Sequence, residues 1–309
     1  MLRFAGRQLV HLIVVLFGAV TITFVALRLS GNPVDALLPA NATAQERQIL
    51  IQQLGLNRGI ADQYWLFLGQ VVRGDMGNSI INGQSAIREV TGQLASSLVL
   101  AGLALAVAAV VGIALGVLSA ERQGGWLDRL CRAASAIGQA APSFWLGLIL
   151  IIVFAVRLRL FPASGMGGAR YLVLPVLTLA VAIVPYVMRL TRTTMIGVLD
   201  AEFMRFHKAK GLRPAVIIYR HGLKNCLPPV ITLLGLQAGP LLGGVVIIEY
   251  VFGRSGVGSL LISSIYNRDY PVVQVAVLVI VAVVVLANVA ADMAVAALDP
   301  RVRLGGRAA

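Results

Sequence analysis

The chain has 309 residues, of which 58% are hydrophobic and only 13% are charged. Soluble globular domains carry about 25% charged residues, so this composition excludes an ordinary soluble fold and favours an integral membrane protein. The formal net charge is +13, but the basic residues flank apolar segments instead of covering one soluble face. This pattern argues against nucleic-acid binding.

Six segments without a charged side chain are long enough to cross a bilayer. A helix needs about 20 apolar residues to span the hydrocarbon layer, and its backbone must be hydrogen-bonded internally there. The sequence therefore predicts an all-α, polytopic membrane protein that forms a single domain over residues 1–309. Its six transmembrane helices are expected at about 9–29, 94–119, 134–156, 171–190, 228–250 and 271–297.

The distribution of basic residues predicts the orientation of these helices. The first uncharged window is too long for a signal-peptide core and lacks a small-residue cleavage site, so it is expected to stay in the protein. Because short cytoplasmic loops are enriched in Lys and Arg, both termini are predicted to be cytoplasmic. The counts are two in 1–8, three in 120–135, eight in 189–224 and three in 298–309, against three in 157–170 and two in 253–270.

The segment 30–93 is predicted to be external. Within it, residues 45–54 and 61–72 have the apolar spacing of short amphipathic helices. Such helices lie at the membrane surface in contact with lipid, and Tyr64 and Trp65 are expected at the level of the headgroups.

Prolines and glycines within the predicted spans could each have one of two structural roles. Pro142, Pro175 and Pro185 could kink helices around a pathway or serve ordinary packing. Four glycines in the fifth span form a face that permits close helix approach, either to another span or to a partner protein. They are Gly235, Gly239, Gly243 and Gly244.

The most informative segment is the predicted cytoplasmic loop 191–226, which contains all three lysines of the chain. Residues 199–210 have helical spacing, with Asp200 and Glu202 expected in the first turn, where carboxylates favour the helix dipole. Gly211 is expected to end this helix in a left-handed conformation, and Pro214 to prevent its continuation. The helix could dock in the cleft of another protein or rest on anionic lipid, and its residue pattern fits both.

The motif in this loop resembles a known family. The stretch AEFMRFHKAKG at 201–211 is followed, after nine residues, by HGLKN and a proline. This pattern resembles the EAA loop of permease subunits in binding-protein-dependent ABC importers, most closely the dipeptide/oligopeptide/nickel branch. Phe206 and His207 depart from the pattern, because that branch usually has small residues there. The matching residues are Ala209, Lys210, Gly211, His221, Leu223, Asn225 and Pro228.

The resemblance extends over nearly the whole chain, and several motifs in the same order are more specific than any one of them. One departure is Arg254 and Ser255, where an aromatic residue and proline are common. Further matching elements lie at 30–36, 54–64, 73–79, 234–244, 249–252, 256–258, 268–271 and 299–301.

The resemblance implies a non-catalytic subunit of the bacterial inner membrane that forms half of a translocation pathway. Its implied partners are a homologous second permease, two ATPase subunits that bind ATP and Mg, and an extracytoplasmic substrate-binding protein. Phe203, Met204 and Phe206 would be packing anchors on the ATPase, and Arg205, Lys208 and Lys210 polar rim contacts. The full implied coupling set is Glu202, Phe203, Met204, Arg205, Phe206, Lys208, Ala209, Lys210, Gly211, His221 and Asn225. Di- or oligopeptides are the expected cargo, although glutathione, nickel chelates, oligosaccharides or haem-like molecules could use the same scaffold.

Other functions are less consistent with the sequence. No phosphate-binding Gly-x4-Gly-Lys-Ser/Thr loop is present, so ATP hydrolysis by this chain is not expected. An ion-coupled secondary transporter should carry an acid near the middle of a span, whereas Glu249 and Asp292 lie toward span ends, where structural roles are expected. An intramembrane enzyme would need a nucleophile, base or metal constellation, and a structural scaffold would leave the shaped loop unexplained. His207 and His221 lack partners at metal-ligand spacing, so no metal or other cofactor is expected in this chain.

Overall fold

The computed structural model describes residues 2–29, 34, 38, 42–53 and 55–298. The matched elements at 299–301 and, apart from Val34, at 30–36 lie outside the described residues, as do the side chains of Lys208 and Asp292. The described residues divide into two compact units, 1–97 with 255–283 and 98–254 with 284–309.

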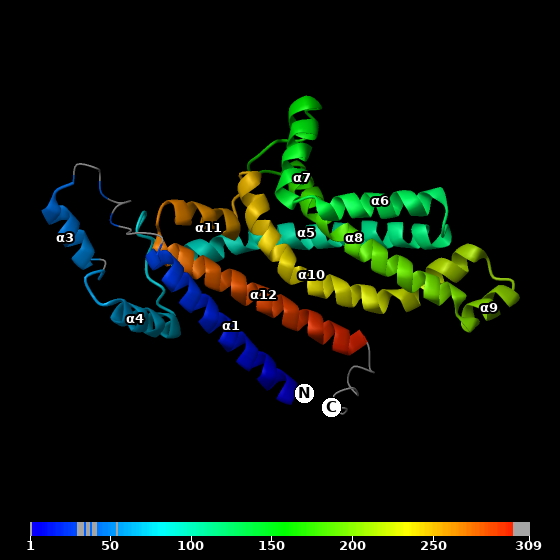
Figure 1. Ribbon diagram of the computed structural model, residues 1–309, viewed down its shortest axis with the longest axis horizontal. Helices are drawn as coiled ribbons and strands as arrows, with labels where there is room; N and C mark the ends of the chain where they lie inside the picture. Colours follow the sequence, from blue (N-terminus) through cyan, green and yellow to red (C-terminus); the bar gives the residue numbers. More distant parts are fainter. Residues whose placement is uncertain (1, 30–33, 35–37, 39–41, 54, 299–309) are drawn as a thin grey trace. The chain divides into compact units, whose positions relative to one another are not determined.

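The described residues form α-helices and two π-helices, and no β-strand forms among them (Figure 1). This confirms the predicted all-α class. The elements are α1 (Leu2–Leu29), α3 (Ala44–Gln53), α4 (Ile60–Arg73), α5 (Ala86–Glu121), α6 (Trp126–Ala140), α7 (Ser143–Leu150), η1 (Ile151–Arg157), α8 (Arg170–Asp200), α9 (Glu202–Ala209), η2 (Val216–Gly222), α10 (Leu223–Val251), α11 (Val257–Tyr266) and α12 (Tyr270–Leu298).

Among the described residues, five stretches of helix are long and apolar enough to cross a membrane: α1, α5, α8, η2 with α10, and α12. The third predicted span, 134–156, is not one continuous helix. It is divided between α6 and the pair α7 and η1, and the axis bends by 106° between them. Ala141 is extended (φ −86°, ψ 130°) because Pro142 disfavours a helical conformation in the preceding residue. If this bent pair is counted as one broken span, the described residues contain six candidate spans.

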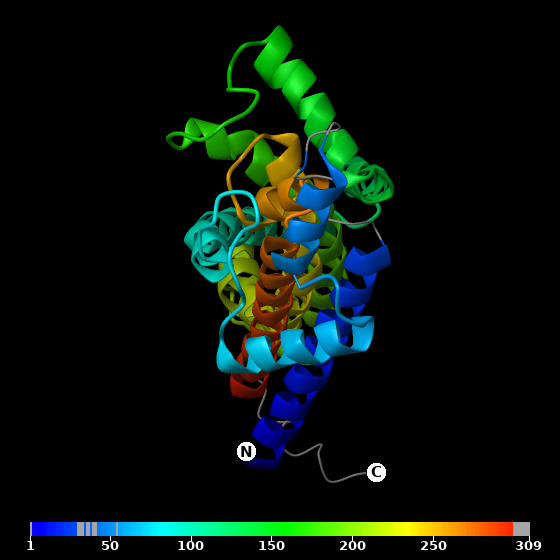
Figure 2. The same ribbon diagram turned by 90° about the vertical axis from the view of Figure 1, so that its left-hand side faces the viewer.

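The first unit is held together by aromatic contacts between α1 and α4. Phe24 stacks on Phe67 with ring centroids 5.8 Å apart, and the Thr21 and Tyr64 hydroxyls share a hydrogen bond of 2.7 Å. Figure 2 shows the pale blue α4 lying across the dark blue α1. Helices are thus present at both predicted places, as α3 and α4. α4 has the expected apolar side, but the apolar residues of α3 do not gather on one side of that helix. The short apolar helix α11, which packs Val257 into a cluster with residues of α12, was not predicted.

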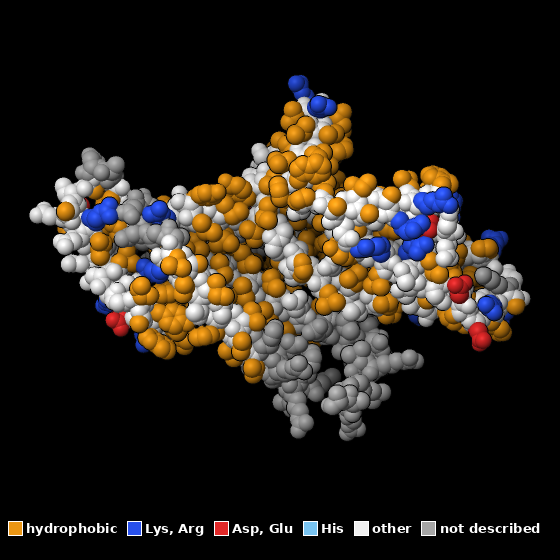
Figure 3. Space-filling view, in the orientation of Figure 1, with side chains coloured by type: hydrophobic (Ala, Val, Ile, Leu, Met, Phe, Trp, Pro, Cys, Tyr) orange, Lys and Arg blue, Asp and Glu red, His pale blue; other side chains and the backbone are white. Residues whose placement is uncertain are grey.

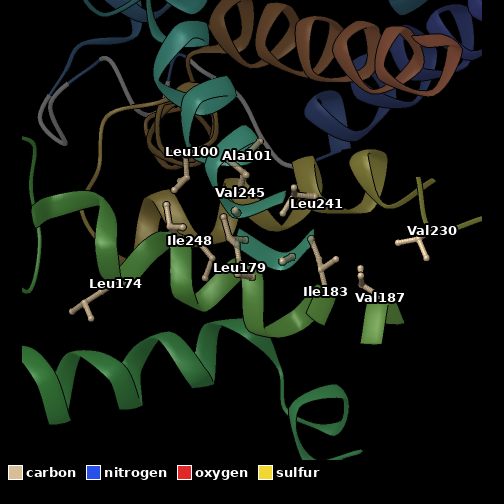
Figure 4. Packing of buried hydrophobic residues seen from close by; sticks show 14 of the residues in the cluster. Leu100, Ala101, Leu174, Leu179, Ile183, Val187, Val230, Leu241, Val245 and Ile248 are labelled. Carbon is tan, nitrogen blue, oxygen red and sulfur yellow. The ribbon is translucent and has the colours of Figure 1, made fainter. Parts of the chain in front are cut away.

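The second unit is built around α8, which packs against α10, α6 and α7. Figure 4 shows Leu179 and Ile183 of α8 beside Val245 and Ile248 of α10 and Leu100 of α5. All of these side chains are buried. The core of this unit is therefore an interface between helices far apart in sequence.

Glycines allow two helix pairs in this unit to approach closely. A Cβ on Gly116 of α5 would lie 2.5 Å from Cβ of Thr191 and 2.8 Å from the Met188 carbonyl oxygen of α8. On α10, a Cβ on Gly235 would lie 2.4 Å from Cβ of Ala291, and Gly239 faces Asn288 of α12. The small-residue face predicted on the fifth span therefore contacts, at these two positions, another helix of the same chain.

A buried carboxylate in the first turn of α6 joins this helix to α5 and α8. Asp128 is only 1% exposed and accepts hydrogen bonds from Nε and Nη2 of Arg192, at 2.7 and 2.9 Å. It also accepts one from the Ser119 hydroxyl and one from the Gly124 N–H. Because a buried carboxylate is stable only when its oxygens are hydrogen-bonded and its charge is paired, this network fixes the end of α8 that leads into the basic loop.

Candidate coupling surface

The predicted loop 191–226 begins as a helix. α8 continues to Asp200, ten residues past the predicted end of the fourth span, and the chain turns at the extended residue Ala201 (φ −66°, ψ 149°). α9 then runs over Glu202–Ala209. Asp200 thus ends α8 instead of lying in the first turn of the loop helix, and Glu202 is the only acid in the first turn of α9.

One face of α9 is buried against the chain itself. Met204 is fully buried, and a Cβ on Gly222 of η2 would lie 3.4 Å from Cε of Met204 and 3.2 Å from Sδ of Met195 in α8. Met204 therefore packs between α8 and η2. The structure separates it from Phe203 and Phe206, with which the sequence had grouped it as a contact to a partner.

Two histidines that are distant in sequence meet at the edge of this buried face. The rings of His207 in α9 and His221 in η2 are stacked, with centroids 4.2 Å apart and planes inclined by 23°. The Asn225 side-chain amide donates a 2.8 Å hydrogen bond to the carbonyl oxygen of His221. The bulky residue at 207, which departs from the family pattern, thus attaches α9 to the returning segment.

Two basic residues lie close to His221 in the sequence. Arg220 lies next to His221 in η2, and Lys224 follows in the first turn of α10. Nδ1 of His207 is buried without a hydrogen-bond partner in the described part of the chain. Within the described residues, no group of three or more His, Cys, Asp or Glu side chains is placed to hold a metal ion.

The other face of α9 is exposed and aromatic. Phe203 is 41% exposed and Phe206 58%, and the ammonium group of Lys210 lies 4.4 Å from the centroid of the Phe206 ring. Glu202, Arg205, Ala209 and Lys210 are also exposed. In Figure 3, charged side chains gather over this end of the unit, around α9 and the adjoining ends of α6 and α8. Two aromatic rings with a charged rim form a surface suited to docking in a protein cleft.

The helix stop predicted at Gly211 is present, because this residue has φ +72°. Pro214 has a different role from the one expected: a new helical segment begins at this residue and leads into η2, as proline is favoured in the first turn of a helix. Beside it, a cavity of about 610 Å³ is lined by Leu212, Pro214, Ile217 and residues at the ends of α5 and α8.

Replacing Met204 by alanine should loosen α9 from the chain. Removal of a fully buried methionine side chain costs about 2–5 kcal/mol, and we expect the midpoint of thermal unfolding in detergent to fall by several degrees. Phe203→Ala is the matched control, because this neighbouring side chain is 41% exposed and its loss should change the midpoint little. Equal shifts for the two variants would show that Met204 does not anchor the helix.

Comparisons with known proteins agree with the resemblance seen in the loop. Residues 112–304 match the family described as "Binding-protein-dependent transport system inner membrane component". The glutathione transport system permease protein GsiC of Pectobacterium atrosepticum is 34% identical over 304 residues, which cover 98% of this chain and 99% of that protein. GsiC of Escherichia coli strain K12 has the same identity and coverage.

The fold has a counterpart among solved structures. A chain of the MetNI methionine ABC transporter, in inward facing conformations, is similar with a TM-score of 0.57 and 20% sequence identity. The match covers 68% of this chain and 96% of that chain, and it supports the likeness of fold alone. With the family match over more than half of the chain, the family predicted from the sequence motifs is confirmed. The chain therefore belongs to the inner membrane components of binding-protein-dependent transport systems, as a multi-pass permease subunit of an ABC importer of the peptide and nickel branch.

Proposed function

We propose that this permease forms half of a translocation pathway together with a homologous second permease, and that α9 transmits the movement of an ATPase subunit to it. The observation that supports this role is the division of α9 into two faces. Met204 and His207 hold one face to α8 and η2, while Phe203 and Phe206 are exposed on the other. Because α9 is anchored to its own protein on one face and presents aromatic side chains on the other, a movement of a bound partner would be transmitted to α8 and η2.

The residues of the loop would have distinct roles in this contact. Phe203 and Phe206 would be the packing anchors, with Arg205, Lys208 and Lys210 as charged contacts around them and Ala209 as a point of close approach. Glu202 would stabilise the start of α9 through the helix dipole. Gly211 would end the helix, and His221 and Asn225 would hold it from the returning segment. ATP and Mg would be bound by the two ATPase subunits, on the cytoplasmic side, where both termini of this chain would also lie.

For the cargo, we propose a short peptide of the glutathione class, delivered by an extracytoplasmic binding protein. Both GsiC relatives are named as glutathione transport system permeases and align over almost their full length. A short peptide also lies within the range of cargo expected from the sequence motifs.

The test is co-purification of ATPase subunits with the wild-type chain and with the double variant Phe203→Ala/Phe206→Ala, both expressed with the complete transporter. Truncating two aromatic anchors costs about 2 kcal/mol each, which weakens binding by more than about a hundredfold. We expect the wild type to retain the ATPases through detergent purification and the double variant to lose them while still inserting in the membrane.

The matched control is Trp126→Ala, which removes an aromatic side chain that is 71% exposed at the start of α6, outside the loop. This variant should retain the ATPases. Equal retention by all three proteins would contradict docking through α9. Uptake of glutathione into proteoliposomes should also require ATP on the ATPase side, and uptake driven by an ion gradient alone would favour a secondary transporter instead.

A further inference from the structure

A second candidate site lies in the unit formed by residues 1–97 and 255–283, which the coupling surface does not include. A cavity of about 390 Å³ is bordered there by α1, α4 and the start of α12. Two arginines and four side-chain amides contribute its polar lining. These residues are Arg28, Arg58, Gln63, Gln70, Asn78 and Gln274.

The described residues that line this cavity carry positive charge without a neighbouring carboxylate. No Asp or Glu is among the described residues that line it, and no described residue forms a hydrogen bond or an ion pair with either guanidinium group. Arg28 is positioned by aromatic rings instead: its guanidinium carbon lies 5.2 Å from the centroid of Phe24 and 5.7 Å from that of Tyr270. Cation–π contacts use the flat face of a guanidinium group and leave its in-plane N–H donors available for an anion.

The cavity lies at the end of a membrane span. Arg28 is the first charged residue after the uncharged window 8–27, so the length of a spanning helix places it where hydrocarbon meets the headgroup layer. The neighbouring helix α4 packs on α1 through Phe67 and exposes Trp65, at 70%, and Leu66, at 48%. An amphipathic helix with exposed aromatic and aliphatic side chains is typical of the lipid interface.

The cavity also has an apolar wall. Phe24, Leu66 and Phe67 border it on the side of α1 and α4. The site therefore combines two cations and several amide donors with hydrocarbon surface, at the depth where a phospholipid changes from headgroup to acyl chain. A soluble anion would use only the polar part of this lining, whereas an anionic lipid would use both parts.

We propose that this cavity binds the headgroup of an anionic glycerophospholipid, with Arg28 and Arg58 facing its phosphate and Phe24 and Leu66 beside the first part of an acyl chain. The amides of Gln70, Asn78 and Gln274 provide hydrogen-bond donors for the headgroup, whereas the Gln63 amide nitrogen already donates to the backbone carbonyl oxygen of Arg58. A zwitterionic lipid fits less well, because its cationic group finds no carboxylate among the described lining residues. This site is independent of the proposed docking of α9.

The test is native mass spectrometry of the purified transporter after exchange into detergent containing equal amounts of phosphatidylglycerol and phosphatidylcholine. We expect the wild type to retain phosphatidylglycerol preferentially. The variant Arg28→Gln/Arg58→Gln should retain roughly tenfold less of it, because each basic residue contributes substantially to the binding of anionic lipid. Arg88→Gln is the charge control for a single substitution, since it removes one positive charge from an exposed position of this unit outside the cavity lining.

A single variant and a competition experiment complete the test. Arg58→Gln alone, which leaves the aromatic contacts of Arg28 intact, should reduce retention severalfold even if the double variant folds poorly. Sodium phosphate at high concentration should not displace the lipid. Equal retention of both lipids by the wild type, unchanged retention by the Arg58→Gln variant, or displacement by inorganic phosphate would each overturn the assignment to a lipid.

Discussion

Replacing Gly116 by alanine should destabilise the protein, although alanine is the better helix former. The added methyl group would lie 2.5 Å from Cβ of Thr191 and 2.8 Å from the Met188 carbonyl oxygen. Because one of these atoms is backbone, the contact can be relieved only by moving α5 away from α8. Such overpacking costs about 1–3 kcal/mol, which outweighs the roughly 1 kcal/mol gained in helix propensity. Thermal unfolding in detergent, followed by the loss of monodisperse protein, measures the difference.

The control for this substitution lies on the same helix. Gly102 has no atom within 4 Å of the position of a Cβ, so Gly102→Ala should leave stability unchanged or raise it slightly. The two substitutions add the same methyl group to the same helix, but only Gly116→Ala is expected to lower the unfolding midpoint. If both raise the unfolding midpoint, α5 and α8 are not in close contact at Gly116.

Replacing Asp128 by alanine should lower the free energy of unfolding more than replacing Met204 by alanine. The variant leaves Arg192, which is only 20% exposed, without its carboxylate, and it removes the acceptor of the Ser119 hydroxyl and the Gly124 N–H. Loss of one partner from a buried ion pair costs about 3–5 kcal/mol. We expect a large fall in the unfolding midpoint and a reduced yield of folded protein.

A double-mutant cycle separates the cost of the unpaired charge from that of lost packing. Asp128→Ala/Arg192→Leu should recover much of the lost stability, because an ion pair replaced on both sides leaves no buried charge alone. The control is Arg132→Ala: this side chain is 52% exposed and 3.6 Å from Asp128, and exposed pairs contribute less than about 1 kcal/mol. Equal losses from Asp128→Ala and Arg132→Ala would show that the carboxylate is not the centre of the network.

Charge spacing predicted the fold well where the bilayer determines it. The uncharged windows located α1, α5, α8, α10 and α12, since a charge inside the hydrocarbon layer is costly. They did not give the helix ends: α8 continues past Arg189 and Arg192 to Asp200, because a helix that leaves the membrane need not stop. The break at Pro142 depends on how α6 and α7 pack, and a proline within a span is compatible with either a kink or a straight helix.

The loop shows the same division between local and long-range information. The stop at Gly211 follows from a local backbone requirement and was predicted. The burial of Met204, the stack of His207 on His221 and the pairing of Asp128 with Arg192 all join residues that are brought together by tertiary packing. Helical spacing places Met204 between two aromatic residues, but it does not reveal which of the three side chains faces the protein's own core.

The prolines of α10 have a mechanical consequence. η2 leads into α10 without interruption, and α10 contains Pro228 and Pro229 near its start. Neither proline can donate a hydrogen bond to the carbonyl four residues earlier. The continuous helix of η2 and α10 is therefore most easily bent here, about one turn beyond the part of η2 that contacts α9. A displacement of α9 would be applied on the short side of this flexible point, and most of α10 lies on its other side. A tilt of about 10° at this point would move the far end of α10, roughly 34 Å along the helix at 1.5 Å per residue, by about 6 Å.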